Sequence, residues 1–270
     1  MQYVISLLAA ILYFISSFLI AKNMRARLHD ETPLPTRWLL MSWIGALLVH
    51  ALSLYALLIT EHGIDLGIFR ALSTVGWLTA GLLLATCFGR ASISIGLILL
   101  PLAGIAAVLG GTLPEVSFIP DGGNKGLEIH IFISLLAYSM LTLATLQAIL
   151  LGYQSNHLHN HHPGGILRIL PSLQEMERLL FQLLTAGFIL LSVALITGFI
   201  FLENIFAQHM VHKTALSIIA WFAYGILIWG HYQFGWRGKL AVRYTLIGFI
   251  LLMLAYFGSK FVLELLLERP

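Results

Sequence analysis

The sequence predicts an all-α membrane protein, a polytopic transmembrane helical bundle of about eight spans. The chain has 270 residues, of which 59% are hydrophobic and only 10% are charged, and its mean hydropathy is +0.91. A single water-soluble core cannot bury so much apolar surface. The apolar runs are about 20 residues long, which suits a membrane-crossing helix rather than a barrel strand. A helix satisfies its own backbone hydrogen bonds in lipid, so the expected fold is a helical bundle.

Charged or Gly- and Pro-containing breaks separate the apolar runs and set the order of the spans. The first run ends in KNMRAR (22–27) rather than in a small-residue cleavage site, so it is expected to remain as a helix. Ser172, followed three residues later by Glu175, has the pattern of a capping box and predicts a helix that leads into the sixth span. The expected spans are 2–22, 38–60, 68–89, 91–110, 130–153, 179–203, 213–234 and 241–266. We treat residues 1–270 as a single integral membrane domain, with a variable four-span half at 1–110 and a second half at 127–262.

The positive charges predict how the spans are oriented. If eight spans alternate, ten of the 15 Lys and Arg residues fall on one face and five on the other. Cytoplasmic loops carry the excess of positive charge, so the first face is expected to be cytoplasmic and both termini to lie outside a bacterial inner (plasma) membrane. The ten are Lys22, Arg25, Arg27, Arg37, Arg90, Arg168, Arg178, Arg237, Lys239 and Arg243; the five are Arg70, Lys125, Lys213, Lys260 and Arg269.

Several classes of function are excluded by what the chain lacks. Its cations are scattered singly rather than gathered along a phosphate-binding stripe, so the lipid bilayer is the expected partner and nucleic acid is not. Cys87 is the only cysteine, which excludes two-thiol redox chemistry. The sequence contains no Ser-His-carboxylate set, no pair of carboxylates inside a span and no Gly-rich phosphate loop. No catalytic residue is therefore predicted.

The segment 154–178 holds four closely spaced histidines and is expected to be a cytoplasmic loop. Such a cluster can bind a divalent metal, but the nearest carboxylate is Glu175, and Pro163 is followed by two glycines. We expect a solvated polar loop and dispensable histidines, with a metal site as the open alternative. The histidines are His157, His159, His161 and His162.

Four further histidines lie within or at the edges of the spans: His50, His130, His212 and His231. Ionisable side chains in spans usually face the bundle interior and mark function. His130 and His212 stand at the same membrane boundary, whereas His50 and His231 differ in depth by roughly 10 Å or more at the rise of an α-helix. We therefore expect the first pair to bind haem iron, because paired imidazoles in an apolar bundle suit haem b. The alternative is that His130 and His212 are ordinary interfacial residues. His50 and His231 would then be neutral imidazoles bonded to neighbouring carbonyls.

Aromatic side chains are available as walls for a buried macrocycle. Those we single out in the spans are Trp77, Trp221, Phe222, Tyr224 and Trp229. Aromatic residues near span ends, such as Trp38 and Trp236, are instead typical of the membrane interface.

Three segments of the second half carry a resemblance to a known family. They are HIFISLLAYSMLTLATLQAILL (130–151), EMERLLFQLLTAGFILLSVALITGFIF (175–201) and the stretch 212–261 from HKTALSIIAW to AYFGSKF. In order and spacing they resemble the cytochrome c assembly protein family, which includes CcsA and the HemX-like and YpjD-like inner-membrane proteins. The resemblance implies that His130 is the periplasmic histidine of CcsA-type members, and that His231 is their transmembrane histidine before a GWRG-like turn.

The same resemblance identifies features that this chain lacks. CcsA-type members hold haem at a loop rich in tryptophan with an aspartate, but here that loop reads ENIFAQHMVHKT (203–214). A second periplasmic histidine after the last span is also absent, and His212 lies where it could substitute. We expect a membrane protein that binds or passes haem in support of cytochrome c biogenesis or haem homeostasis, accessory to haem attachment rather than an enzyme. Its partners would be other cytochrome c assembly or haem-biosynthesis proteins.

Two other functions remain open. One is a regulatory or scaffold protein that kept the bundle and lost the haem site. The other is a transporter of a small ligand or proton, with His50 as a relay near mid-membrane.

Overall fold

The computed structural model describes residues 2–60, 63–86, 93–113, 118–119, 125–159, 170–201, 208–258 and 261. Within this part of the chain, eight helices are long and apolar enough to cross a membrane, which confirms the predicted all-α bundle. They are α1 (Gln2–Leu28), α2 (Thr36–Leu58), α3 (Ile68–Thr86), α4 (Gly96–Thr112), α5 (Lys125–His159), α6 (Leu173–Phe201), α7 (Gln208–Phe234) and α8 (Lys239–Met253). A 3-10 turn, η1 (Ile93–Ile95), precedes α4, and a π-helical turn, η3 (Leu254–Gly258), continues α8. Predicted residues that lie outside the described ranges are Cys87, Arg90, His161, His162, Arg168, Lys260 and Arg269.

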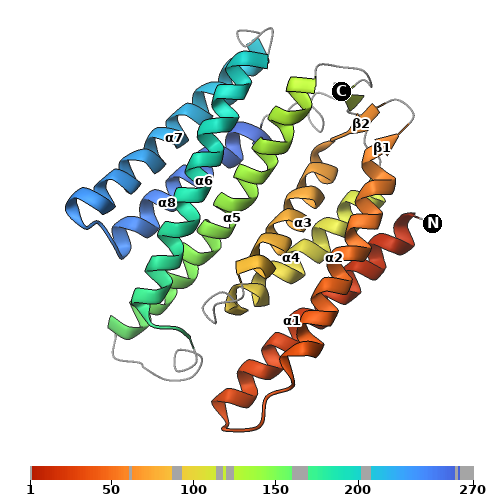
Figure 1. The fold of residues 1–270 in the computed structure, drawn as a ribbon, viewed down its shortest axis with the longest axis vertical. Coiled ribbons are helices and arrows are strands. Elements are labelled where there is room, and N and C mark those ends of the chain that lie inside the picture. Colours follow the sequence, from red (N-terminus) through yellow and green to blue (C-terminus); the bar gives the residue numbers. More distant parts are fainter. Residues whose placement is uncertain are drawn as a thin grey trace.

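The helices form two groups, which we call the N-terminal half (α1–α4) and the C-terminal half (α5–α8). Figure 1 shows them side by side, with α3 and α5 at the border between them. In the first group α1 packs on α2 and α4, and α3 packs on α4. In the second group α5 packs on α6 and α8, while α7 packs on α8 and α6.

Small residues let the helices of the N-terminal half approach closely. A Cβ atom on Gly104 of α4 would lie 3.3 Å from the Cα atom of Ala10 on α1. A Cβ atom on Gly110 would lie 2.8 Å from the Cβ atom of Ser73 and 3.1 Å from the carbonyl oxygen of Phe69, both on α3. Small side chains allow the backbones of two helices to come into direct contact, which is a common way for helices to pack in a membrane.

A small antiparallel sheet, which the sequence did not predict, lies at one end of the bundle. Its strands are β1 (Ile59–Thr60), β2 (Gly63–Asp65) and β3 (Phe118–Ile119), in that order. We call this the sheet end and the other the opposite end. Figure 1 places the start of α1 towards the sheet end.

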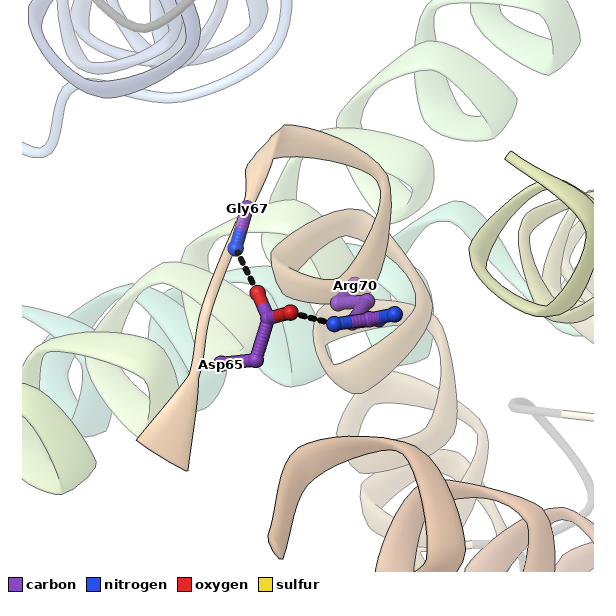
Figure 2. A network of polar contacts seen from close by, with 3 residues as sticks. All are labelled: Asp65, Gly67 and Arg70. Carbon is purple, nitrogen blue, oxygen red and sulfur yellow. Dashed lines mark hydrogen bonds and ion pairs between the residues drawn. The ribbon is translucent and has the colours of Figure 1, made fainter. Parts of the chain in front are cut away.

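A buried ion pair fixes the connection from β2 into α3. Figure 2 shows Asp65 paired with Arg70 and accepting a hydrogen bond from the backbone N–H of Gly67 at 3.2 Å. The Asp65 side chain is only 1% exposed. Leu66, held between these groups, packs with Val75 of α3 and Leu135 of α5. The ion pair therefore holds a residue of the N-terminal half against the C-terminal half.

The predicted start of the sixth span is confirmed in its details. The Ser172 hydroxyl accepts a hydrogen bond from the Glu175 N–H at 3.3 Å, and the Glu175 carboxylate accepts one from the Ser172 N–H at 3.3 Å. This reciprocal pair is a capping box, and α6 begins directly after Ser172.

Some predicted boundaries were wrong because helices continue beyond the apolar runs. α1 continues through the basic segment to Leu28, and α5 continues to His159, so the first six residues of the expected loop 154–178 are helical. Outside the hydrocarbon layer, polar residues lose nothing by staying helical. Hydrogen bonds also hold this end of α5: Gln147 donates to the carbonyl of Met176 and Gln154 to that of Pro171, each at 2.9 Å.

Candidate functional site

A cavity of about 380 Å³ lies in the C-terminal half at the sheet end. We call it the sheet-end cavity. Its walls come from α5, α6, α7, α8 and η3, and Leu66 adds one residue from the connection before α3. Most of the lining is apolar, and the volume falls in the range of small-molecule sites. The side chains that bring polar atoms are His130, Ser134, Tyr138, Lys213, Thr214, Ser217 and Tyr256.

His130 is hydrogen-bonded to α6 through its Nδ1 atom, which lies 3.1 Å from the Thr197 hydroxyl oxygen. The Thr197 hydroxyl also lies within donating distance of the carbonyls of Val193 at 2.9 Å and Ala194 at 3.0 Å. When its proton is donated to either carbonyl, the Thr197 oxygen accepts from the His130 Nδ1–H, and Nε2 keeps a lone pair. This tautomer is the one that a histidine needs to bind a metal through Nε2.

A glycine makes room for the His130 ring. A Cβ atom on Gly198 of α6 would lie 2.9 Å from Cε1 of His130, closer than real side chains approach. Thr197 and Gly198 are neighbours on one turn of α6: the first binds the ring, and the second lets it approach the helix closely.

His212, the expected partner of His130, lies outside this lining. It is exposed in the first part of α7, whereas the next residue, Lys213, lines the cavity. The pairing of His130 with His212 remains a prediction, because the structure brings only His130 onto the wall.

His231 lies at a second cavity, of about 580 Å³, near the opposite end between α6 and α7. We call it the opposite-end cavity. The His231 Nδ1–H donates to the carbonyl oxygen of Trp236 at 2.8 Å, and a carbonyl can only accept, so Nε2 again keeps its lone pair. Its ring stacks on Phe181 with ring centroids 3.5 Å apart. The cavity also carries Glu177, Arg178 and Arg237.

His50 lies inside the N-terminal half, away from both cavities, and both of its ring nitrogens have hydrogen-bond partners. Its side chain is fully buried, its Nδ1 atom lies 3.2 Å from the Tyr13 hydroxyl, and its Nε2 atom lies 2.9 Å from the Ser73 hydroxyl. Both nitrogens are thus occupied. Binding a metal would require breaking one of these bonds. The structure places His50, His130 and His231 at three separate sites.

None of the five aromatic residues singled out as possible walls lines the sheet-end cavity. Its aromatic side chains are Tyr138, Phe199 and Tyr256. Phe222 and Trp229 are instead 55% and 57% exposed on α7, while Trp77 donates to the Leu47 carbonyl in the N-terminal half. The sequence predicts which helix carries an aromatic residue, but it does not predict whether that side of the helix faces the interior of the bundle.

The four clustered histidines were expected in a solvated loop. His157 is instead on α5, where its Nδ1–H donates to the Tyr153 carbonyl at 3.1 Å. Among the residues that the structure describes, no three His, Cys, Asp or Glu side chains are grouped to hold a metal ion.

Sequence reasoning missed Thr197 and Gly198, which contact His130, and the α7 group Lys213, Thr214 and Ser217, which lines the same cavity. Only the grouping of the α7 residues could have been predicted from the sequence. Residues at i, i+1 and i+4 share one side of a helix, so the last three could have been placed together on α7. The contact between α5 and α6 that joins Thr197 to His130 is 67 positions long in sequence and has no such signal.

Comparisons with known proteins agree with this architecture. The chain is 32% identical over 269 residues to the inner membrane protein YpjD of Escherichia coli K12, covering 97% of this chain and 99% of that protein. An uncharacterized 28.8 kDa protein of Azospirillum brasilense is 35% identical over 150 residues, 54% of this chain and 55% of its own length. The cytochrome c biogenesis protein CcsA of Prochlorococcus marinus is 25% identical over 91 residues, 33% of this chain and 29% of its own length. No solved structure matches the chain at a significant level.

The eight apolar helices and the relation to YpjD make this a multi-pass inner-membrane protein. The sequence model for the cytochrome C assembly protein matches residues 38–267, most of the chain. The chain belongs to the cytochrome c assembly protein family.

Proposed function

We propose that this protein binds b-type haem in the sheet-end cavity through Nε2 of His130, and that it handles haem in support of cytochrome c biogenesis or haem homeostasis. The observation that carries the proposal is the position of His130 on the cavity wall, with its Nδ1 atom bonded to a Thr197 hydroxyl that has two carbonyl acceptors of its own, an arrangement that leaves Nε2 for a ligand. Apolar walls around a free imidazole nitrogen suit a ring that is bound and not chemically changed. The match to a family named for cytochrome c assembly supports the same role.

The proposal assigns the other histidines by their surroundings. His212, one residue before the cavity-lining Lys213, is the proposed second axial ligand on the same face. His231, whose Nε2 also has its lone pair, is the proposed ligand at the other face. His50 is assigned a structural role because both of its nitrogens are bonded.

The test is the reduced-minus-oxidised absorption spectrum of the purified protein after haem-replete expression. A bound b-type haem gives a characteristic difference spectrum, and His130→Gly and His212→Gly should each lose haem. Imidazole added to the buffer should refill the vacant ligand position and restore it. The matched control is His157→Gly, on the same helix as His130, which should keep its haem.

Two outcomes would contradict parts of this proposal. A wild-type protein that stays colourless would favour a regulator that has lost the haem site. Full six-coordinate haem in His212→Gly would remove His212 from the pair and leave His130 to be tested alone.

The proposed orientation follows from the ten-to-five split of Lys and Arg, which puts both termini on the outer side. A periplasmic reporter fused after Pro270 should be active. Activity of a cytoplasmic reporter at the same position would overturn the orientation, and with it the assignment of the sheet-end cavity to the outer face.

A further inference from the structure

The opposite-end cavity carries two arginines that have no counter-ion in the part of the chain that the structure describes. Arg178 lies in the second turn of α6 and Arg237 in the turn between α7 and α8, and both line the cavity. Among the described residues, neither takes part in an ion pair. The Arg237 Nε–H donates to the carbonyl oxygen of Gly235 at 3.3 Å, and its two terminal nitrogens are left to bind a ligand. Guanidinium groups in this state can donate to an anion.

The other ionisable groups of the lining do not cancel this charge. Glu177 is the one carboxylate among the lining residues, and its Oε1 atom accepts a hydrogen bond from the Gly238 N–H at 2.8 Å. It therefore holds the turn against α6. His231 donates its Nδ1–H to the Trp236 carbonyl, so its Nε2 atom can only accept and takes no part in binding an anion. Two arginines against one carboxylate leave the lining positive.

The lining becomes less polar along α6, from the start of the helix inwards. Gln174, Arg178 and Gln182 come first, and Ile189 follows Arg178 by 11 positions, which is about 16 Å of helix. The Ile189 side chain is 56% exposed, and a large apolar side chain that is exposed on a membrane span faces lipid. The cavity thus has charged groups near the end of the span and an apolar wall at the depth of the hydrocarbon. A phospholipid has its headgroup and acyl chain in the same order.

A hydroxyl group on the same wall lacks a partner. The Thr185 hydroxyl is buried and makes no hydrogen bond to any described residue, whereas Thr197 on the same helix donates to the Val193 carbonyl at 2.9 Å. A buried hydroxyl without a partner costs free energy. Thr185 lies two turns inwards from Arg178, about 10 Å along the helix. In a phospholipid the ester carbonyls lie inwards from the phosphate, and a rotation of the threonine side chain would let its hydroxyl donate to one of them.

We infer that the opposite-end cavity binds an anionic phospholipid, whose phosphate is held by Arg178 and Arg237 and whose acyl chain runs along α6 past Ile189. Basic pockets between membrane helices bind anionic headgroups in this way, and a guanidinium group matches the geometry of phosphate oxygens. A soluble phosphate would use the same two arginines but would leave the apolar part of the cavity unfilled. The inference goes beyond the proposed function, in which neither arginine has a part.

The experiment is native mass spectrometry of the purified full-length protein in detergent, with equal amounts of phosphatidylglycerol and phosphatidylcholine that carry identical acyl chains. The two lipids share the phosphate and the chains, but only the first has a net negative charge. The wild type should retain phosphatidylglycerol about tenfold more than phosphatidylcholine, the size expected for arginines near an anionic headgroup. Replacing Arg178→Gln and Arg237→Gln together should abolish this preference, and Arg178→Lys with Arg237→Lys should keep most of it, since both charges remain.

The matched control is Arg25→Gln together with Arg27→Gln. It removes two exposed cations from the last turn of α1, at the same end of the bundle, and neither lines the cavity. Its lipid preference should equal that of the wild type. A further arm adds inorganic phosphate at millimolar concentration, which should leave the bound lipid in place because it cannot replace the contacts of the acyl chain.

Each contrary result would overturn the lipid site. Equal retention of the two lipids by the wild type would show that the arginines do not select an anion. The same loss of preference in the α1 control would show a general attraction to positive charge. Displacement of the lipid by inorganic phosphate would show that the ligand is a soluble phosphate. A colourless protein with an arginine-dependent lipid preference would contradict the proposed function and support this site.

Discussion

Each half of the molecule has a histidine in a membrane-spanning helix, His50 in one and His130 in the other. The two differ in how their ring nitrogens are hydrogen-bonded. His50 in the N-terminal half is fully buried, with both ring nitrogens bonded to hydroxyls. His130 in the C-terminal half lies on a cavity wall, and its Nδ1 atom is bonded to the Thr197 hydroxyl. A satisfied imidazole holds helices together, whereas a half-satisfied one is prepared for a ligand. Residue type does not distinguish these roles; hydrogen bonding does.

The glycines of the two halves show the same contrast. In the N-terminal half, Gly104 and Gly110 face backbone atoms or small side chains, and they bring helices together. In the C-terminal half, Gly198 faces the His130 ring and Gly248 faces the Tyr224 ring, where a Cβ atom would lie 2.7 Å from Cζ. There, glycine makes room for a large side chain between helices.

The largest effect should come from His50→Ala, which tests the structural side of this contrast. It leaves the Tyr13 and Ser73 hydroxyls without their partner in a buried site and creates a cavity, so we expect a loss of roughly 3 kcal/mol of stability. Thermal unfolding of the detergent-solubilised protein measures this. The control is His29→Ala, which changes an exposed residue after α1. An unchanged unfolding temperature together with lost haem would reverse the roles assigned to the two halves.

The next effect should come from Asp65→Asn, at the connection between the halves. The change removes the charge that pairs with Arg70, and we expect a loss of about 2 kcal/mol, less than for a fully buried pair because Arg70 is 14% exposed. Leu66 would no longer be fixed on the cavity wall, so haem binding should weaken as well. Thermal unfolding and haem titration of the purified apoprotein measure the two effects, with the exposed Asp30→Asn as control. A loss of stability with unchanged haem affinity would show that the two halves are independent.

A smaller effect, confined to the ligand, is expected for Thr197→Val. This change removes the acceptor for the His130 Nδ1–H while keeping the shape of the side chain. Loss of such a supporting hydrogen bond typically weakens a metal–histidine site about 10- to 100-fold, and the unfolding temperature should hardly change. Haem titration of the purified apoprotein measures the affinity, and Thr197→Ser, which keeps the hydroxyl, should bind like the wild type. If valine bound haem as well as threonine, Thr197 would have no part in orienting the imidazole.

The smallest effect is expected from replacing His157, His159, His161 and His162 together with asparagine. His157 donates to a carbonyl of its own helix, and no metal cluster is present among the described residues. Haem content per protein should therefore stay as in the wild type. A large loss would show that these histidines pass haem or metal to the bundle.

The sequence was sufficient to predict the helical bundle, because each membrane span can be recognised from its own run of residues. Twenty apolar residues in a row need a membrane wherever they occur in the chain, and the capping box at Ser172 and Glu175 is equally local. The surroundings of the histidines, by contrast, are formed by residues far apart in the sequence, and no short stretch of sequence predicts them. Whether His50 meets Tyr13 and Ser73, or His130 meets Thr197, depends on which helices are neighbours and how each is rotated. Depth, estimated from the helical rise, could therefore suggest a pair of ligands but could not place His212 on the cavity wall.

The 35 residues of α5 give a rod about 52 Å long, which is longer than the hydrocarbon layer of about 30 Å. With His130 at the membrane boundary, as the sequence predicts, the helix would cross that layer in roughly 20 residues and leave it near Leu150. Its last turns would then extend roughly 13 Å beyond the lipid, tied to the start of α6 by the bond from Gln154 to the Pro171 carbonyl. The membrane face opposite the sheet end would thus carry a helical ridge, continuous with the helix that carries His130.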